Sequence, residues 1–107
     1  MELQLWALSA GASCWMIDLE PYEHSRVAGV IERLSLDPVE GRIDAVLTDG
    51  TGRILARWVI RRPTPQLACV PGRFVVIEGV PIPGDDSLLM VEPGFELVDQ
   101  PQVAVAE

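Results

Sequence analysis

The side chains of this sequence that offer a distinctive chemistry are mainly its arginines. All eight basic residues are arginines, and they lie between Arg26 and Arg73. A guanidinium group presents a planar fork of N–H donors that matches a phosphate or a carboxylate. Five arginines fall on two neighbouring predicted strands and at the mouth of the loop that follows them: Arg42, Arg53, Arg57, Arg61 and Arg62. This arrangement predicts a surface that binds anionic groups, phosphates above all.

Residues that could carry out catalysis or hold a metal are few. The single histidine, His24, precedes the first predicted strand, and Cys14 and Cys69 lack the spacing of a zinc site or of a disulfide framework. No phosphate-cradling glycine loop occurs, and Asp85 and Asp86 fall in a predicted turn. We therefore expect no enzymatic activity, no cofactor and no metal site. Both cysteines are interpreted as core residues of a protein in the reducing cytoplasm.

The overall charge opposes a general affinity for polyanions. The formal net charge is −8 at pH 7, and like charge repels phosphate. Five acids share residues 26–73 with the eight arginines, whereas the flanks carry the other eleven acids and no arginine. The sequence has no apolar run of the roughly 18 residues that a membrane span requires, and its opening residues lack the basic charge of a secretory signal. We expect anion binding to be weak and local, and no association with a membrane.

Two alternating runs around Asp49-Gly50-Thr51-Gly52 position the arginines. Residues 42–48 and 53–60 alternate apolar and polar side chains with the period of a β-strand, and the glycine-rich link is typical of a tight hairpin. The alternation predicts inward side chains at Ile43, Ala45, Leu47, Ile54, Ala56, Trp58 and Ile60. The outward face then comprises Arg42, Asp44, Val46, Thr48, Arg53, Leu55, Arg57 and Val59. Counting back from the hairpin places Asp44 opposite Arg57, where an ion pair would use part of the positive charge.

Three further strands complete a predicted all-β fold. Residues 26–36 form a long strand that bends at Gly29 and carries Ile31 and Arg33 on one face. Residues 73–80 form a strand with Gly79 in its interior, and residues 87–92 form a final strand that a proline and a glycine interrupt before residues 95–98. Prolines between residues 61 and 70 indicate a loop, with one helical turn near residues 66–69.

Five short strands with interior glycines favour a small closed barrel over a sandwich, because glycines relieve crowding where strands coil sharply. The fold prediction is a five-stranded Greek-key barrel of the oligonucleotide/oligosaccharide-binding (OB) type, with an SH3-like barrel as the alternative. The barrel is expected at residues 26–98. Residues 1–25 form an N-terminal appendage, helical or irregular, and residues 99–107 a mobile acidic tail.

Several short motifs strengthen this prediction, and together they span roughly residues 25–98. They are Val27-Ala28-Gly29, Asp49-Gly50-Thr51-Gly52, Trp58, Arg61-Arg62-Pro63, Pro71-Gly72, Glu78-Gly79 and Phe95-Glu96-Leu97. In these motifs the sequence resembles small bacterial OB-fold nucleic-acid-binding proteins of the kind common in high-GC Gram-positive bacteria. The resemblance implies an OB fold and binding of single-stranded nucleic acid.

The expected function is non-catalytic, weak binding of single-stranded nucleic acid through the five arginines named above. OB folds combine a basic groove with aromatic platforms for the bases, and the platforms are largely missing because Trp58 falls on the inward face. We interpret Trp58 as a core residue, with a base-stacking role as the alternative. The competing function is an acidic protein-interaction or scaffold subunit that docks on a partner such as a nucleic-acid enzyme. The choice between DNA and RNA, the partner and the oligomeric state stay open.

Overall fold

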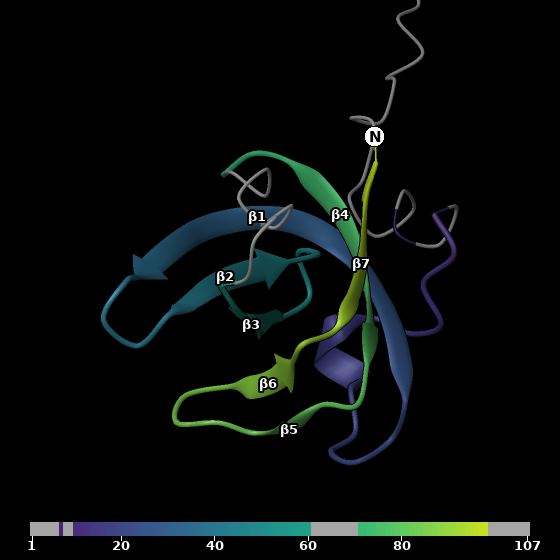
Figure 1. The fold of residues 1–107 in the computed structure, drawn as a ribbon. Coiled ribbons are helices and arrows are strands. Elements are labelled where there is room, and N and C mark those ends of the chain that lie inside the picture. The colour runs from purple at the N-terminus through teal and green to yellow at the C-terminus, as the bar shows by residue number, and fades with distance from the viewer. Residues whose placement is uncertain (1–6, 8–9, 61–70, 99–107) are drawn as a thin grey trace, which may run out of the picture.

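A single curled β-sheet makes up most of the structure, a computed structural model that describes residue 7 and residues 10–60 and 71–98 (Figure 1). A short 3-10 helix, η1 (Met16–Asp18), precedes the strands. The strands are β1 (Ser25–Asp37), β2 (Arg42–Thr48), β3 (Arg53–Val59), β4 (Phe74–Gly79), β5 (Ile82–Pro83), β6 (Leu88–Val91) and β7 (Gly94–Val98). Their order in the sheet is β5-β6-β3-β2-β1-β4-β7, with every pair antiparallel except β3 and β6. The fold is all-β, as predicted.

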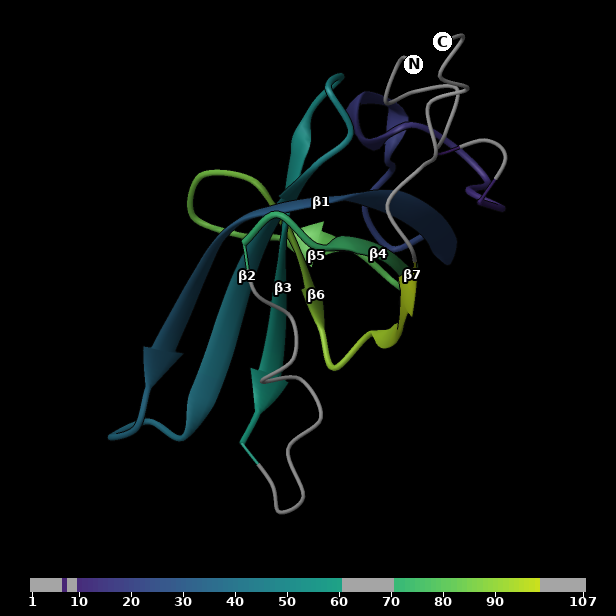
Figure 2. The ribbon, with the colours of Figure 1, turned by 90° about the horizontal axis from the view of Figure 1, so that it is seen from above.

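Strand β1 curls the sheet because it serves two neighbours in succession. Its first half pairs with β4 and its second half with β2 (Figure 2). The two pairings meet at Val30. At the adjacent Gly29, a Cβ atom would lie 2.5 Å from the carbonyl oxygen of Thr48 and 2.8 Å from Cε of Met16. Only glycine fits there, as expected for a strongly bent strand. Gly79 has room for a Cβ at ordinary contact distances, so crowding explains only the first of the two interior glycines.

The sheet has seven strands where five were expected, because the last predicted strand is interrupted and gains a short partner. Strands β6 and β7 are separated by Glu92, which has a positive φ of 53°, and by Pro93, which has no N–H to donate. Strand β6 pairs with β3, whereas β7 pairs with β4 on the far side of β1. Since only two residues link them, the sheet must curl enough to bring its β6 and β7 ends close together.

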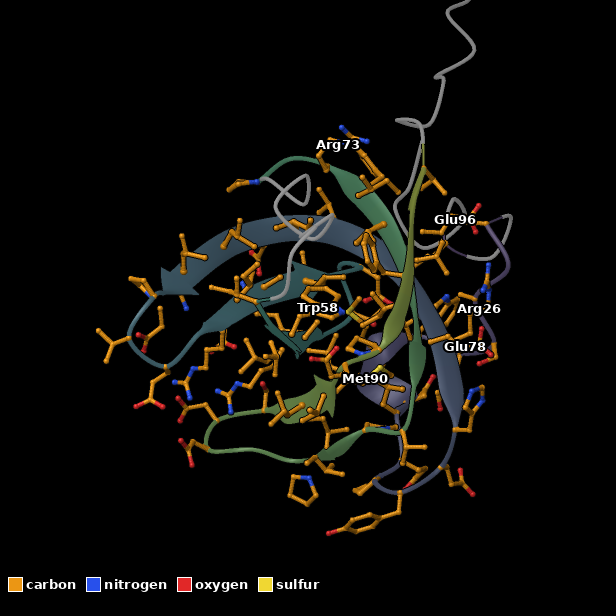
Figure 3. All side chains as sticks on the ribbon, viewed as in Figure 1. Arg26, Trp58, Arg73, Glu78, Met90 and Glu96 are labelled. Atoms are coloured by element: carbon orange, nitrogen blue, oxygen red, sulfur yellow. The ribbon has the colours of Figure 1, made fainter. Side chains whose placement is uncertain are left out.

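The core lies inside this curl, on the predicted inward face of the β2–β3 hairpin. Six of the seven predicted inward residues are buried and the seventh, Ile60, packs partly buried against them. Trp58 is 2% exposed, its indole Nε1–H donates to the carbonyl oxygen of Pro93 at 3.0 Å, and its ring meets Phe95 edge-on at 5.4 Å (Figure 3). The prediction that Trp58 is a core residue is confirmed. It fastens β3 to the corner between β6 and β7.

The hairpin tip also anchors the segment before β1. Met16 and Leu19 of this segment belong to the main core. The side chain of Asp49 is 1% exposed, and its carboxylate accepts a hydrogen bond from the backbone N–H of Met16 at 2.8 Å. Within the turn it also accepts from the backbone N–H groups of Thr51 at 2.9 Å and Gly52 at 3.3 Å, and from the Thr51 hydroxyl at 2.6 Å. The Thr51 hydroxyl oxygen in turn accepts from the N–H of Ile17 at 3.2 Å. Part of the expected appendage is therefore built into the core. The predicted tail at residues 99–107 and helical turn at 66–69 lie outside the described residues.

Candidate functional site

A groove of about 750 Å³ opens on the outer face of β2 and β3. Its floor is aliphatic, formed by Val46, Leu55 and Leu89, because these are outward residues of neighbouring strands. The turn between β5 and β6, residues 83–87, closes one side. Three arginines also line the groove: Arg33, Arg53 and Arg57. The face that the alternation pattern marked as outward thus forms part of a concave site.

The structure brings together only some of the five predicted arginines. Arg53 and Arg57 line the groove. Arg42 lies on the same face of β2 but outside the groove lining, with its Nε 3.7 Å from Oδ2 of Asp44. Arg61 and Arg62 lie outside the described residues. The predicted site is therefore described at three of its five positions.

Both predicted arginines of the groove are held by carboxylates. Arg57 donates to Asp44 from Nε at 2.9 Å and from a terminal nitrogen at 3.1 Å, which confirms the predicted pair. Arg53 donates to Glu32 in the same two-pronged way, at 2.6 and 3.3 Å. These hydrogen bonds raise the pKa of both guanidinium groups, and the bond from Arg53 lowers the pKa of Glu32. Each pair occupies two of the five N–H donors of its arginine and offsets its charge, so both arginines meet a phosphate already partly engaged.

Arg33 is the groove arginine that the sequence pattern missed. The register between β1 and β2 shifts between Ile31, which pairs with Leu47, and Arg33, which pairs with Val46. Glu32 is the extra residue of this bulge, so Arg33 turns to the outer face instead of following Ile31 inward. The signal in the sequence was the succession of two charged residues, which breaks the alternation. Arg33 is exposed and makes no ion pair with any residue that the structure describes.

The turn between β5 and β6 contributes acidic residues to the groove lining. The backbone N–H of Gly84 donates to the carbonyl oxygen of Ser87 at 2.9 Å, which places the exposed Asp85 and Asp86 at the tip of a tight loop. A Cβ at Gly84 would lie 2.6 Å from that same oxygen, so this turn requires glycine. The charge of Asp85 adds to that of Asp44 in raising the pKa of Arg57. The groove therefore has a guanidinium wall and a carboxylate wall.

A second charged cluster, on β1, β4 and β7, has a structural role. The side chain of Arg26 donates to the carbonyl oxygen of Gly11 at 3.1 Å and to Glu78 at 3.3 Å, and it lies 3.8 Å from Glu96 (Figure 3). His24 lies 3.2 Å from the other oxygen of Glu78. Since Arg26 donates both to the N-terminal segment and to Glu78 of β4, this cluster holds that segment to the sheet.

Two absences within the described residues bear on function. In residues 10–60 and 71–98, no three His, Cys, Asp or Glu side chains are grouped so that they could hold a metal ion. The described part of the chain also contains no helix with the length and apolar character needed to cross a membrane.

Comparison with known proteins leaves the family open: no family model matches this chain, and no curated protein matches it significantly. The resemblance to OB-fold proteins stays a prediction from short motifs. The function is accordingly argued from the groove itself.

Proposed function

We propose that the curled sheet is an OB-type barrel in which β6 and β7 together act as one interrupted fifth strand. The pairings support this: β1 pairs with both β2 and β4, β3 pairs in parallel with β6, and β7 pairs with β4. OB barrels bind their ligands on the face of the second and third strands, between flanking loops. The groove lies on that face, beside the turn that leads into β6.

The proposed function is non-catalytic, weak binding of single-stranded nucleic acid in this groove. The observation that carries it is the presence of Arg33, Arg53 and Arg57 around an aliphatic floor in one concave site. Guanidinium groups bind phosphates of the backbone, and the floor offers an apolar surface to the face of a base. The groove lining includes no aromatic side chain among the described residues, so base stacking adds little affinity.

Charge limits the strength of this binding. Arg53 and Arg57 already have counter-ions, and the whole chain carries a net charge of −8. Of the three arginines in the groove lining, Arg33 is the one whose charge no ion pair within the described residues offsets. About one to three phosphate contacts correspond to a logarithmic salt slope of about −0.7 to −2 for a single strand. We therefore expect binding that is detectable at low salt and poor at physiological salt.

The test uses Arg33→Glu, with Arg73→Glu as its matched control. Both arginines are exposed, and Arg73 stands beside the start of β4, outside the groove lining (Figure 3). Fluorescence anisotropy of a labelled oligonucleotide of about twelve nucleotides is measured at low salt. Arg33→Glu should weaken binding roughly tenfold, whereas Arg73→Glu, with the same change of net charge, should change it much less. No detectable binding by the wild type would refute the function, and equal losses in both variants would refute the site.

A second candidate function is docking on a protein partner, and the N-terminal segment favours it. Trp15, Ile17 and Tyr22 are 37%, 67% and 71% exposed within eight residues of chain. Exposed large apolar side chains are enriched where proteins bind other proteins. Ile17→Ser with Tyr22→Ser should then remove a specific co-purifying protein and leave oligonucleotide binding unchanged.

A further inference from the structure

The two walls of the groove offer opposite hydrogen-bonding chemistry. Arg33, Arg53 and Arg57 present only N–H donors, whereas the ionised side chains of Asp85 and Asp86 only accept hydrogen bonds. The acidic wall repels phosphates, so it cannot serve the backbone of a nucleic acid. A ligand that uses both walls must carry acceptors on one edge and donors on another.

Backbone hydrogen bonds support the loop that carries the acidic wall. The short pairing of β5 with β6, Ile82 with Leu89 and Pro83 with Leu88, supports the loop, and the Gly84–Ser87 hydrogen bond closes it. A wall that is ordered before the ligand arrives costs little conformational entropy on binding. Asp85 and Asp86 are thus placed to select a ligand as well as to repel phosphate.

Guanine is the nucleic-acid base whose edges match these two walls. Its N7 and O6 accept hydrogen bonds side by side and pair with an arginine fork. Its N1–H and N2–H groups donate side by side and suit a carboxylate. Thymine and uracil offer one N–H between two carbonyl oxygens. Cytosine and adenine have an acceptor nitrogen beside their amino group. All four bases would therefore place an acceptor atom against a carboxylate.

We propose that the groove prefers single strands that contain guanine, with Asp85 and Asp86 accepting hydrogen bonds from N1–H and N2–H while a groove arginine binds O6 and N7. This preference rests on the proposed function. The aliphatic floor of Val46, Leu55 and Leu89 supports the face of the base between the walls.

The experiment compares three labelled thymidine oligomers of about twelve nucleotides at one low salt concentration. One is pure thymidine, one carries isolated guanines, and one carries inosine at the guanine positions, which removes only the N2 amino group. The wild type should bind the guanine oligomer roughly tenfold more tightly than the thymidine oligomer, and inosine should remove most of that preference. Asp85→Asn with Asp86→Asn should abolish the preference while strengthening binding to thymidine. The matched control is Glu20→Gln with Glu23→Gln, two exposed acids outside the groove lining, which should leave the preference intact.

Each alternative outcome is distinct. If the wild type binds all three oligomers equally, or if Asp85→Asn with Asp86→Asn strengthens binding to all of them by the same factor, the acids act only by repelling phosphate and the inference is wrong. The function proposed above would survive that result. If no oligomer binds at low salt, the proposed function and this inference fall together.

Discussion

Asp49→Asn is the sharpest test of how the hairpin tip holds the molecule together. In the wild type one carboxylate oxygen accepts from the N–H of Met16 at 2.8 Å, and the other accepts three hydrogen bonds from Thr51 and Gly52. An asparagine of the same shape can keep its oxygen on only one side. If the oxygen stays toward Thr51 and Gly52, the amide –NH₂ faces the Met16 N–H and two donors oppose each other. The flipped amide would oppose three donors and is worse.

The expected loss follows from these contacts. A hydrogen bond to a charged group contributes about 1.5–3 kcal/mol, and a buried donor left without a partner costs a similar amount. Burial of the wild-type charge carries a desolvation cost that asparagine avoids, which offsets part of the loss. We therefore expect a decrease of about 2 kcal/mol in the free energy of unfolding, a large share of the stability of a small domain.

The assay is urea unfolding followed by tryptophan fluorescence, together with hydrogen exchange at the amides of Met16 and Ile17. Both amides should lose protection in Asp49→Asn, because the N-terminal segment is released from the hairpin tip. Asp86→Asn makes the same change of charge at an exposed loop position and should shift stability by less than about 0.5 kcal/mol. If Asp49→Asn stays within about 0.5 kcal/mol of the wild type, or if exchange at Met16 does not change, the anchoring argument is wrong.

Trp58→Ala should lower the free energy of unfolding, measured in urea, by about 3–5 kcal/mol. Trp58→Phe should lower it by about 1–3 kcal/mol, because the buried carbonyl oxygen of Pro93 loses its hydrogen bond. A well-folded Trp58→Ala protein would contradict the core assignment. Gly29→Ala should clearly lower the melting temperature, whereas Gly79→Ala should leave it nearly unchanged because Gly79 has room for a Cβ. Equal decreases in both variants would contradict the role assigned to crowding at Gly29. Asp44→Asn should release Arg57 and strengthen oligonucleotide binding roughly two- to fivefold in a low-salt titration; weaker binding would mean that the ion pair orients the arginine for its ligand.

The faces of the β2–β3 hairpin were predictable because nothing interrupts their alternation. The inward residues are buried as expected, and the Asp44–Arg57 pair follows from counting across the turn. The pattern failed in β1, where the bulge at Glu32 shifts the phase by one residue and sends Arg33 outward. A bulge is a property of the pairing between two strands, so the sequence of one strand alone predicts it poorly.

Other features depend on contacts between distant residues. Asp49 was recognised only as part of the hairpin link, and the hydrogen bond that it accepts from Met16 comes from a segment with little pattern of its own. The break in the last strand was predicted from Pro93 and Gly94 and is present in the structure. The pairing of each half with a different neighbour, β6 with β3 and β7 with β4, depends on distant contacts that the sequence did not indicate. The acidic wall of the groove was identified only as a turn, because a turn motif does not indicate which surface its loop faces.

The bond between Met16 and Asp49 also imposes an order on folding. The two residues stand 33 positions apart, so the N-terminal segment is synthesised well before its anchor exists. A hairpin closes within microseconds of being made, because its contacts are local. The segment docks only after that turn has formed, and until then Met16 and Leu19 stay without their place in the core. The segment around Met16 is thus made before the hairpin that anchors it and reaches its final position after that hairpin.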